Sequence, residues 1–240
     1  MKWVETYKIN ANDADLNDAV SASGVLRYMQ DTANCQMEGE GPSYRELLDR
    51  GLAFVVSRLR LSLYNPLRAH DVIESETWTT PSKGAIFNRC FRIKKDGMIM
   101  AEAATCWALV GIENRKIYRV SEVDFSYGGD EPLELDAPAR IRVPDDVALR
   151  LAGERTVEYA DVDVNGHMNN TKYPDFLSGW AAPMKGRRAV SMGISFRSEA
   201  PLGCVLKVYH GELDGVHYVR SVKESGEVNA EAEIVFEDIR

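Results

Sequence analysis

The sequence reads twice as one helix followed by a run of strands, and this order limits the fold more than any other feature. In the first half, apolar side chains recur with a helical period over residues 21–39, and strand patterns follow at 54–64, 71–79, 85–94 and 98–111. In the second half, a helix at 171–182 precedes strand patterns at 189–197, 203–212, 216–223 and 228–237. Shorter elements are predicted at 3–9 (strand), 42–51 (helix) and 155–160 (strand). Strands that follow one another without intervening helices predict an antiparallel sheet and an α+β fold.

Short matches between the two halves indicate an internal repeat. The matched segments are Asp15-Leu16-Asn17 with Asp163-Val164-Asn165, Arg27-Tyr28 with Lys172-Tyr173, Tyr64-Asn65-Pro66-Leu67 with Glu199-Ala200-Pro201-Leu202, and Ala101-Glu102 with Ala230-Glu231. A turn-rich, acidic stretch at 126–138 separates the halves. We therefore expect an N-terminal domain at 1–125, a linker at 126–138 and a C-terminal domain at 139–240.

The richest polar stretch, residues 161–170, stands immediately before the second long helix. Its polar side chains are those of Asp161, Asp163, Asn165, His167, Asn169 and Asn170. A helix N-terminus has unpaired N–H groups and the positive end of the helix dipole, so it favours negative charge that develops during a reaction. A lone histidine crowded among acids and amides at such a place indicates an active site.

Two other interpretations of this loop are open at the level of sequence. Asx-rich turns commonly do no more than connect a strand to a helix. The spacing of Asp161, Asp163 and Asn165 also matches the first half of an EF-hand, but Lys172 stands where that calcium loop needs a bidentate Glu. We expect no metal site.

The pattern Asp163-x-Asn165-x-His167-x-Asn169-Asn170-x-x-Tyr173, followed by Phe196-Arg197-Ser198-Glu199, resembles the acyl-acyl carrier protein (acyl-ACP) thioesterases of plastids and bacteria. The resemblance implies a tandem, or double, hotdog fold in which each half wraps a long antiparallel sheet around a central helix. It also implies hydrolysis of fatty acyl-ACP, which ends chain elongation in fatty acid biosynthesis. Catalytic roles are carried over to Asp163, Asn165, His167 and Glu199.

The chemistry available to these residues is that of carboxylate, amide and imidazole. No G-x-S-x-G serine elbow occurs near His167, and Ala200 occupies the position where some plastid members of the family have a cysteine. We assign Cys204 to strand packing. Glu199 with His167 would orient or deprotonate the attacking water, or His167 would position the thioester or protonate the departing sulfur. Asn165 would orient Asp163 or the substrate carbonyl, and backbone N–H groups at the helix entry would hold the oxyanion.

The first half keeps the frame of the site without its chemistry. Ala19 stands at the position that matches His167, and the segment match places Tyr64 opposite Glu199. We therefore expect one active site per chain. The first half then serves as scaffold or lines the acyl channel, for which the predicted substrate-binding residues are the helix stripe Val25, Tyr28, Met29, Thr32 and Ala33.

Other acyl-thioester functions remain as alternatives. An acyl-CoA thioesterase would use the same residues on a different carrier. A hotdog dehydratase or hydratase has a signature resembling Asp-x-Asn-Pro-x-His, whereas this chain has Gly166 after Asn165 and a shorter step from Asp163 to His167. A non-catalytic acyl-binding protein is a third possibility.

Composition limits the classes of molecule that this protein is expected to bind. The net charge of −8 argues against nucleic acid. An acidic carrier protein would need a local basic patch, and Arg89, Arg92, Lys94 and Lys95, or Lys185, Arg187 and Arg188, could supply one or be ordinary solvated surface. No apolar run is long enough to span a membrane, and the first residues resemble no targeting peptide. We expect no cofactor, no membrane partner and a cytoplasmic location; a homodimer is compatible with the sequence.

Overall fold

The chain folds around one long antiparallel sheet. The computed structural model describes residues 1–127, 129–135 and 140–239. Its strands are β1 (Trp3–Lys8), β2 (Leu52–Leu63), β3 (Val72–Lys83), β4 (Ile86–Lys95), β5 (Met98–Gly111), β6 (Ile117–Tyr118), β7 (Arg150–Thr156), β8 (Arg187–Phe196), β9 (Val205–Leu213), β10 (Val216–Lys223) and β11 (Val228–Asp238). They lie in the order β1-β3-β4-β5-β2-β8-β11-β10-β9-β7, and β6 pairs with β5.

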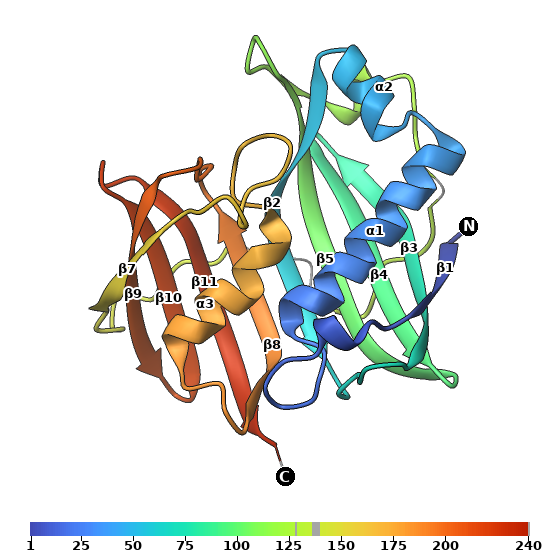
Figure 1. Ribbon diagram of the computed structural model, residues 1–240. Coiled ribbons are helices and arrows are strands. Elements are labelled where there is room, and N and C mark those ends of the chain that lie inside the picture. The colour runs from blue at the N-terminus through green and yellow to red at the C-terminus, as the bar shows by residue number, and fades with distance from the viewer. Residues whose placement is uncertain (128, 136–139, 240) are drawn as a thin grey trace.

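Two helices lie against the same side of this sheet, one over each half (Figure 1). They are α1 (Ala22–Glu40) and α3 (Tyr173–Ala181); a short α2 (Tyr44–Asp49) follows α1, and the 3-10 turns are η1 (Ala11–Asp13), η2 (Val120–Glu122) and η3 (Asn170–Lys172). The predicted tandem hotdog therefore matches the structure. Within the described residues, no helix has both the length and the apolar character needed to cross a bilayer.

The pairing of β2 with β8 joins the two half-sheets. Arg58 to Ser62 run antiparallel to Ser195 to Ser191. The side chains of Leu59 and Leu61 point from β2 into the same apolar cluster as those of Met192 and Ile194 from β8. The strand predicted at residues 54–64 is confirmed as β2, and the two halves share one hydrophobic core.

The helices begin where the sequence provides caps. Ser21 accepts a hydrogen bond from the N–H of Gly24 and starts α1, and Ser43 forms a capping box that starts α2. Residues 171–182 were predicted as one helix, but Asn169 first caps the 3-10 turn η3, and α3 begins at Tyr173. The strand predicted at 155–160 was misplaced, because β7 ends at Thr156 and a loop follows.

The strand register corrects the alignment of the repeat. The cross-strand pairs Arg92–Glu102 and Arg220–Glu231 are equivalent. The N–H groups of residues 64 and 65 both donate to Met100 O, as those of residues 197 and 198 both donate to Asn229 O. The counterpart of Glu199 is therefore Pro66, and the predicted match with Tyr64 is wrong. Tyr64 instead donates its hydroxyl to Glu102 at 2.9 Å.

The helix match needs a similar correction. The isolated bridges Ala14↔Val20 and Val162↔Met168 are equivalent, and so are the N-cap residues Ser21 and Asn169 that follow them. In this alignment, the residue equivalent to Tyr173 is Val25 and not Tyr28.

The proposed linker at 126–138 lies partly outside the described residues, at 128 and 136–138, and the domain division stays a prediction. Its described part is packed. The Trp78 indole N–H donates to Glu131 O at 2.8 Å, and the side chain of Leu133 is buried with Trp78 and Cys90. The segment therefore covers the face of the first half-sheet that α1 does not cover.

Both basic clusters considered for a carrier protein are largely neutralised. On β4, Arg92, Lys94 and Lys95 form ion pairs with Glu102, Glu76 and Asp71. Arg89 is buried, and burial lowers its pKa to about 10. In the second cluster, Arg187 pairs with Asp238 and Arg188 with Glu237. These arginines and lysines hold strands together, so they do not form a free cationic surface.

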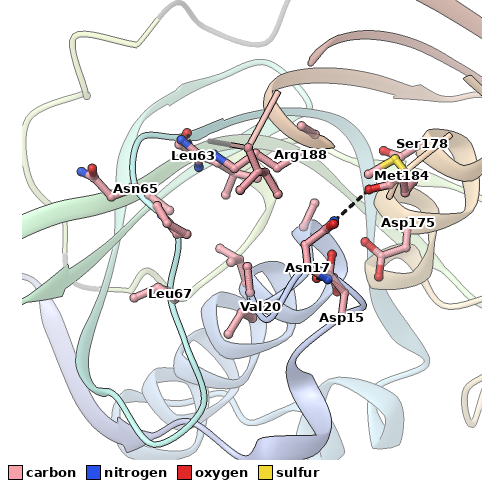
Figure 2. Close-up of a pocket in the computed structure, with 18 residues that line it drawn as sticks. Asp15, Asn17, Val20, Leu63, Asn65, Leu67, Asp175, Ser178, Met184 and Arg188 are labelled. Atoms are coloured by element: carbon pink, nitrogen blue, oxygen red, sulfur yellow. Dashed lines mark hydrogen bonds between the residues drawn. The ribbon is translucent and has the colours of Figure 1, made fainter. Parts of the chain in front are cut away.

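The first-half loop that resembles the polar loop at 161–170 is a structural clasp. The Asn17 amide donates to Met184 O at 2.8 Å and to Arg187 O at 3.0 Å, and its oxygen accepts from the N–H of Gly186 at 2.8 Å. Figure 2 shows Asn17 reaching Met184 from across the seam between the halves. The cavity beside it, lined in part by Ala19, has a volume of about 40 Å³, which suits water and is too small for an acyl chain.

We predict that Asn17→Ala lowers the free energy of unfolding by about 1–3 kcal/mol, because it leaves partly buried backbone groups of the 184–187 turn without partners. Urea unfolding followed by circular dichroism measures this. The matched control is Asn165→Ala, which removes the same group from the equivalent loop and should cost less than about 0.5 kcal/mol. Equal losses in the two variants would contradict the clasp.

Candidate active site

The polar loop before α3 is a tight, internally bonded turn. The N–H of Asp163 donates to His167 O at 3.1 Å, and that of Gly166 donates to Asp163 O at 2.9 Å. Gly166 has a φ of 75°, a conformation that glycine adopts without strain. The turn therefore reverses the chain so that Asn165 projects from its tip and His167 from its returning arm.

His167 and Glu199 come together through the backbone. His167 forms an isolated bridge with Pro201, and the N–H of Met168 donates to Ala200 O at 2.8 Å. These contacts bring His167 Nε2 to 3.5 Å from Glu199 Oε2. The side chains are 33% and 43% exposed, so water reaches both. A base and an acid at this separation suit proton transfer through a small tightening of the pair or through one water.

Asp163 braces the loop. One carboxylate oxygen accepts from the N–H of Asn165 at 2.9 Å, and the other accepts from the Asn169 amide at 3.2 Å. Asp161 is occupied too, by the Arg155 guanidinium and by the N–H of Glu158. The carboxylates that the EF-hand alternative would need are thus engaged within the loop.

The oxyanion site expected from backbone N–H groups at the helix entry stays a prediction, and three of these groups already have partners within the protein. The N–H of Asn169 donates to Asp161 O at 2.9 Å, that of Thr171 to Asn169 Oδ1 at 2.9 Å, and that of Lys172 to Asn169 O at 3.0 Å. These three N–H groups are used in capping and turn formation. The side-chain amide of Asn165 lies at the exposed tip of the loop.

Two side chains from the first half reach the candidate site, one at Asn165 and one at Glu199, and neither was predicted from the sequence. The Tyr44 hydroxyl on α2 donates to Asn165 Oδ1 at 3.1 Å. Arg115 Nη1, in the turn between β5 and β6, lies 3.8 Å from Glu199 Oε1. Both residues are far from the loop along the chain, and no local pattern marks them.

The thiol nearest to the site is inactive. Cys204 Sγ contacts Val205 O at 3.8 Å, and burial raises the pKa of this thiol, so it is protonated at neutral pH. Burial also raises the pKa of Tyr173, at the start of α3, to about 12, and its hydroxyl bonds with Asn229. Tyr173 therefore packs under the site as a neutral phenol.

The predicted substrate-binding stripe packs into the same hydrophobic cluster as Met168 of the polar loop. Val25, Met29, Thr32 and Ala33 are buried beneath α1, and Thr32 Oγ1 donates to Tyr28 O at 2.8 Å and lies 2.7 Å from Ser75 Oγ on β3. Tyr28 is half-buried and donates its hydroxyl to Asp13 at 2.6 Å. Their role in substrate binding stays a prediction, as do the catalytic roles of the loop residues.

Comparison with known proteins matches both halves of the chain. The model of the acyl-ACP thioesterase N-terminal domain matches residues 1–125, and that of the acyl-ACP thioesterase C-terminal domain matches residues 148–238. The chloroplastic palmitoyl-ACP thioesterase of Arabidopsis thaliana is 23% identical over 223 residues, which is 85% of this chain and 53% of that protein. The chloroplastic dodecanoyl-ACP hydrolase of Cinnamomum camphora is 22% identical, over 84% of this chain and 57% of its own length. This chain spans about half the length of the curated relatives that it matches.

Solved structures share the fold over nearly the whole chain. An acyl-ACP thioesterase from Bacteroides thetaiotaomicron superposes with a TM-score of 0.88 at 21% identity, covering 98% of each chain. The 12:0-ACP thioesterase from Umbellularia californica gives a TM-score of 0.79 at 18% identity, covering 99% of this chain and 97% of that one. These likenesses confirm the double hotdog architecture. Since the two family models together cover most of its length, the chain belongs to the acyl-ACP thioesterase family.

Proposed function

We propose that this protein hydrolyses the thioester of fatty acyl-ACP and releases the free fatty acid. The observation that carries the proposal is the approach of His167 to Glu199 beside the exposed amide of Asn165, at the end of a sheet whose two halves both match the thioesterase family. Proton transfer groups and an oxyanion donor are what thioester hydrolysis needs.

In this proposal, Glu199 accepts a proton from water as the oxygen attacks the thioester carbonyl. The tetrahedral oxyanion is held by the Asn165 amide, a contribution worth about 10²–10³ in rate for a well-placed donor. When the intermediate collapses, the carbon–sulfur bond breaks, Glu199 passes the proton that it took from water to His167, and His167 gives a ring proton to the departing thiolate, so that both residues return to their starting states. Asp163 acts through the loop by fixing the backbone that presents Asn165 and His167.

The carrier and the setting are part of the proposal. Acyl carrier protein is preferred over coenzyme A because of the family match and not because of a cationic patch, since most cations of the two candidate clusters are ion-paired with carboxylates. We propose a role in ending fatty acid chain growth in the cytoplasm, a reducing compartment that suits four free cysteines. Measuring thiol release from matched acyl-ACP and acyl-CoA substrates separates the two carriers. A hydratase or an acyl-binding protein would release no thiol with turnover.

We predict that His167→Ala and Glu199→Gln each reduce kcat by at least about 100-fold, because each removes a proton transfer group. Thiol release from acyl-ACP measures turnover, and circular dichroism checks the fold. Glu134→Gln is the matched control, since Glu134 is exposed and remote from His167 in the chain. Near-normal turnover of Glu199→Gln would show that Glu199 is a surface carboxylate without a catalytic role.

A second prediction concerns the thiols. Burial raises the pKa of Cys35, Cys90, Cys106 and Cys204. A variant with all four replaced by Ala or Ser should keep its turnover within about tenfold of wild type, because protonated thiols are poor nucleophiles. A loss of thousands-fold in a folded variant would overturn the mechanism based on carboxylate and imidazole.

A third prediction concerns chain length. If the buried stripe of α1 borders the acyl channel, Met29→Ala should favour longer chains and Ala33→Phe shorter ones, since each buried methylene is worth about 0.8 kcal/mol. Turnover on a graded series of acyl chains measures the optimum. Asn34→Ala, on the exposed face of the same helix, is the control and should leave the optimum in place. An unchanged optimum in both core variants would make the first half a scaffold.

A further inference from the structure

We propose that the first half completes the active site with two positioning residues, Arg115 and Tyr44, which orient Glu199 and Asn165 of the second half. This inference rests on the proposed thioesterase activity and adds to it. The first half lacks catalytic residues of its own, with Ala19 and Pro66 at the equivalent positions. It nonetheless sends one side chain to each of two functional groups of the other half.

Arg115 is held in place by the turn that carries it. Its own N–H donates to Gly111 O at 3.0 Å, and the N–H of Gly111 donates to Lys116 O at 2.8 Å. The next residue in the turn, Ile112, donates its N–H to Gly51 O at 2.8 Å and so ties the turn to the end of α2. Arg115 has a φ of 55°, which is uncommon for a residue other than Gly, Asn or Asp. The turn thus presents this side chain at some backbone cost, as is typical of functional positions.

The carboxylate of Glu199 is faced from both sides. Arg115 Nη1 lies 3.8 Å from Oε1, and His167 Nε2 lies 3.5 Å from Oε2. Glu199 is 43% exposed on a loop after β8, where a carboxylate with one partner would rotate freely. A cation on its outer oxygen directs the inner oxygen toward His167. Arg115 is itself 74% exposed, so it acts on the orientation of Glu199 more than on its desolvation.

Tyr44 fixes the amide of Asn165 in a similar way. Ser43 caps α2 with a capping box, and this places Tyr44 at the first position of the helix. Its hydroxyl donates to Asn165 Oδ1 at 3.1 Å. With Oδ1 used as an acceptor, the Nδ2 group of Asn165 is the one turned toward other partners. That is the orientation an oxyanion donor requires.

Because both residues act through others, their loss should lower kcat and leave KM within about twofold. Arg115→Ala should reduce kcat about five- to tenfold, the upper range of one exposed ion pair plus some misplacement of the carboxylate. Arg115→Lys should recover most of this, since a single contact at this range needs charge and not the guanidinium fork. Arg187→Ala is the matched control, because it removes an arginine from an exposed ion pair at the other end of β8.

Double-mutant cycles then test the partners. Tyr44→Phe should reduce kcat about two- to tenfold in the wild type and cause no further loss in an Asn165→Ala background. Arg115→Ala should likewise cause no further loss in a Glu199→Gln background. Equal losses with and without the partner would overturn the assignment, as would a kcat of Arg115→Ala equal to that of Arg187→Ala or a change in KM alone.

A measurement independent of turnover separates this inference from the proposed function. In the proton–nitrogen NMR spectrum, the side-chain amide signals that vanish in Asn165→Ala belong to Asn165. These signals should shift in Tyr44→Phe and stay in place in Arg187→Ala, whether or not acyl-ACP is hydrolysed. Unmoved signals in Tyr44→Phe would refute the Tyr44 contact even in an active thioesterase. If the Asn165 signals shift in Tyr44→Phe but the wild-type protein does not hydrolyse acyl-ACP, the Tyr44 contact stands and the proposed function is rejected.

Discussion

The antiparallel pairing of β2 with β8 is the interaction on which the rest of the molecule depends. Each half-sheet has an apolar face that one helix covers, and an inner edge with unpaired backbone groups that only another strand can satisfy. Joining the two inner edges satisfies both and merges the two cores. The same junction brings the N-termini of α1 and α3 together, where Ser23 and Asp175 each cap the other's helix at 3.0 Å. The candidate catalytic loop and the clasp loop are thereby both placed on the seam.

Much of the fold followed from periodicity in the sequence. Long amphipathic patterns such as those of α1 and β2 were located to within a few residues, because burial of one face dominates their energetics. The register that relates the two halves to each other was not predicted correctly. The similar short segments around Pro66 and Pro201 suggested that Tyr64 corresponds to Glu199. Strand pairing decides the register, however, and it makes Pro66 the residue equivalent to Glu199. Cross-strand ion pairs explain why the basic runs on β4 were misread as a possible surface patch.

Only those residues of the candidate site that lie close together in the sequence could be predicted from it. Residues 163–170 lie on one turn, so their spacing already indicates a shared function, and Glu199 was added by family resemblance. Tyr44 and Arg115 reach the loop through the tertiary fold and share no motif with it. The expected backbone oxyanion donors stay a prediction. Helix-entry N–H groups are free in an idealised helix, but here those of Asn169, Thr171 and Lys172 are bonded to Asp161 and Asn169.

The clasp made by Asn17 has a consequence for how such a chain can change over generations. The two loops have nearly the same backbone, down to the left-handed residue at Asp18 and Gly166. In the second-half loop, Asn165 is exposed. In the first-half loop, the side-chain amide nitrogen and oxygen of Asn17 both form hydrogen bonds with the turn at 184–187. A histidine at position 19 would therefore not by itself give the first loop the free polar groups of the second, because the Asn17 side chain is committed to holding the two halves together.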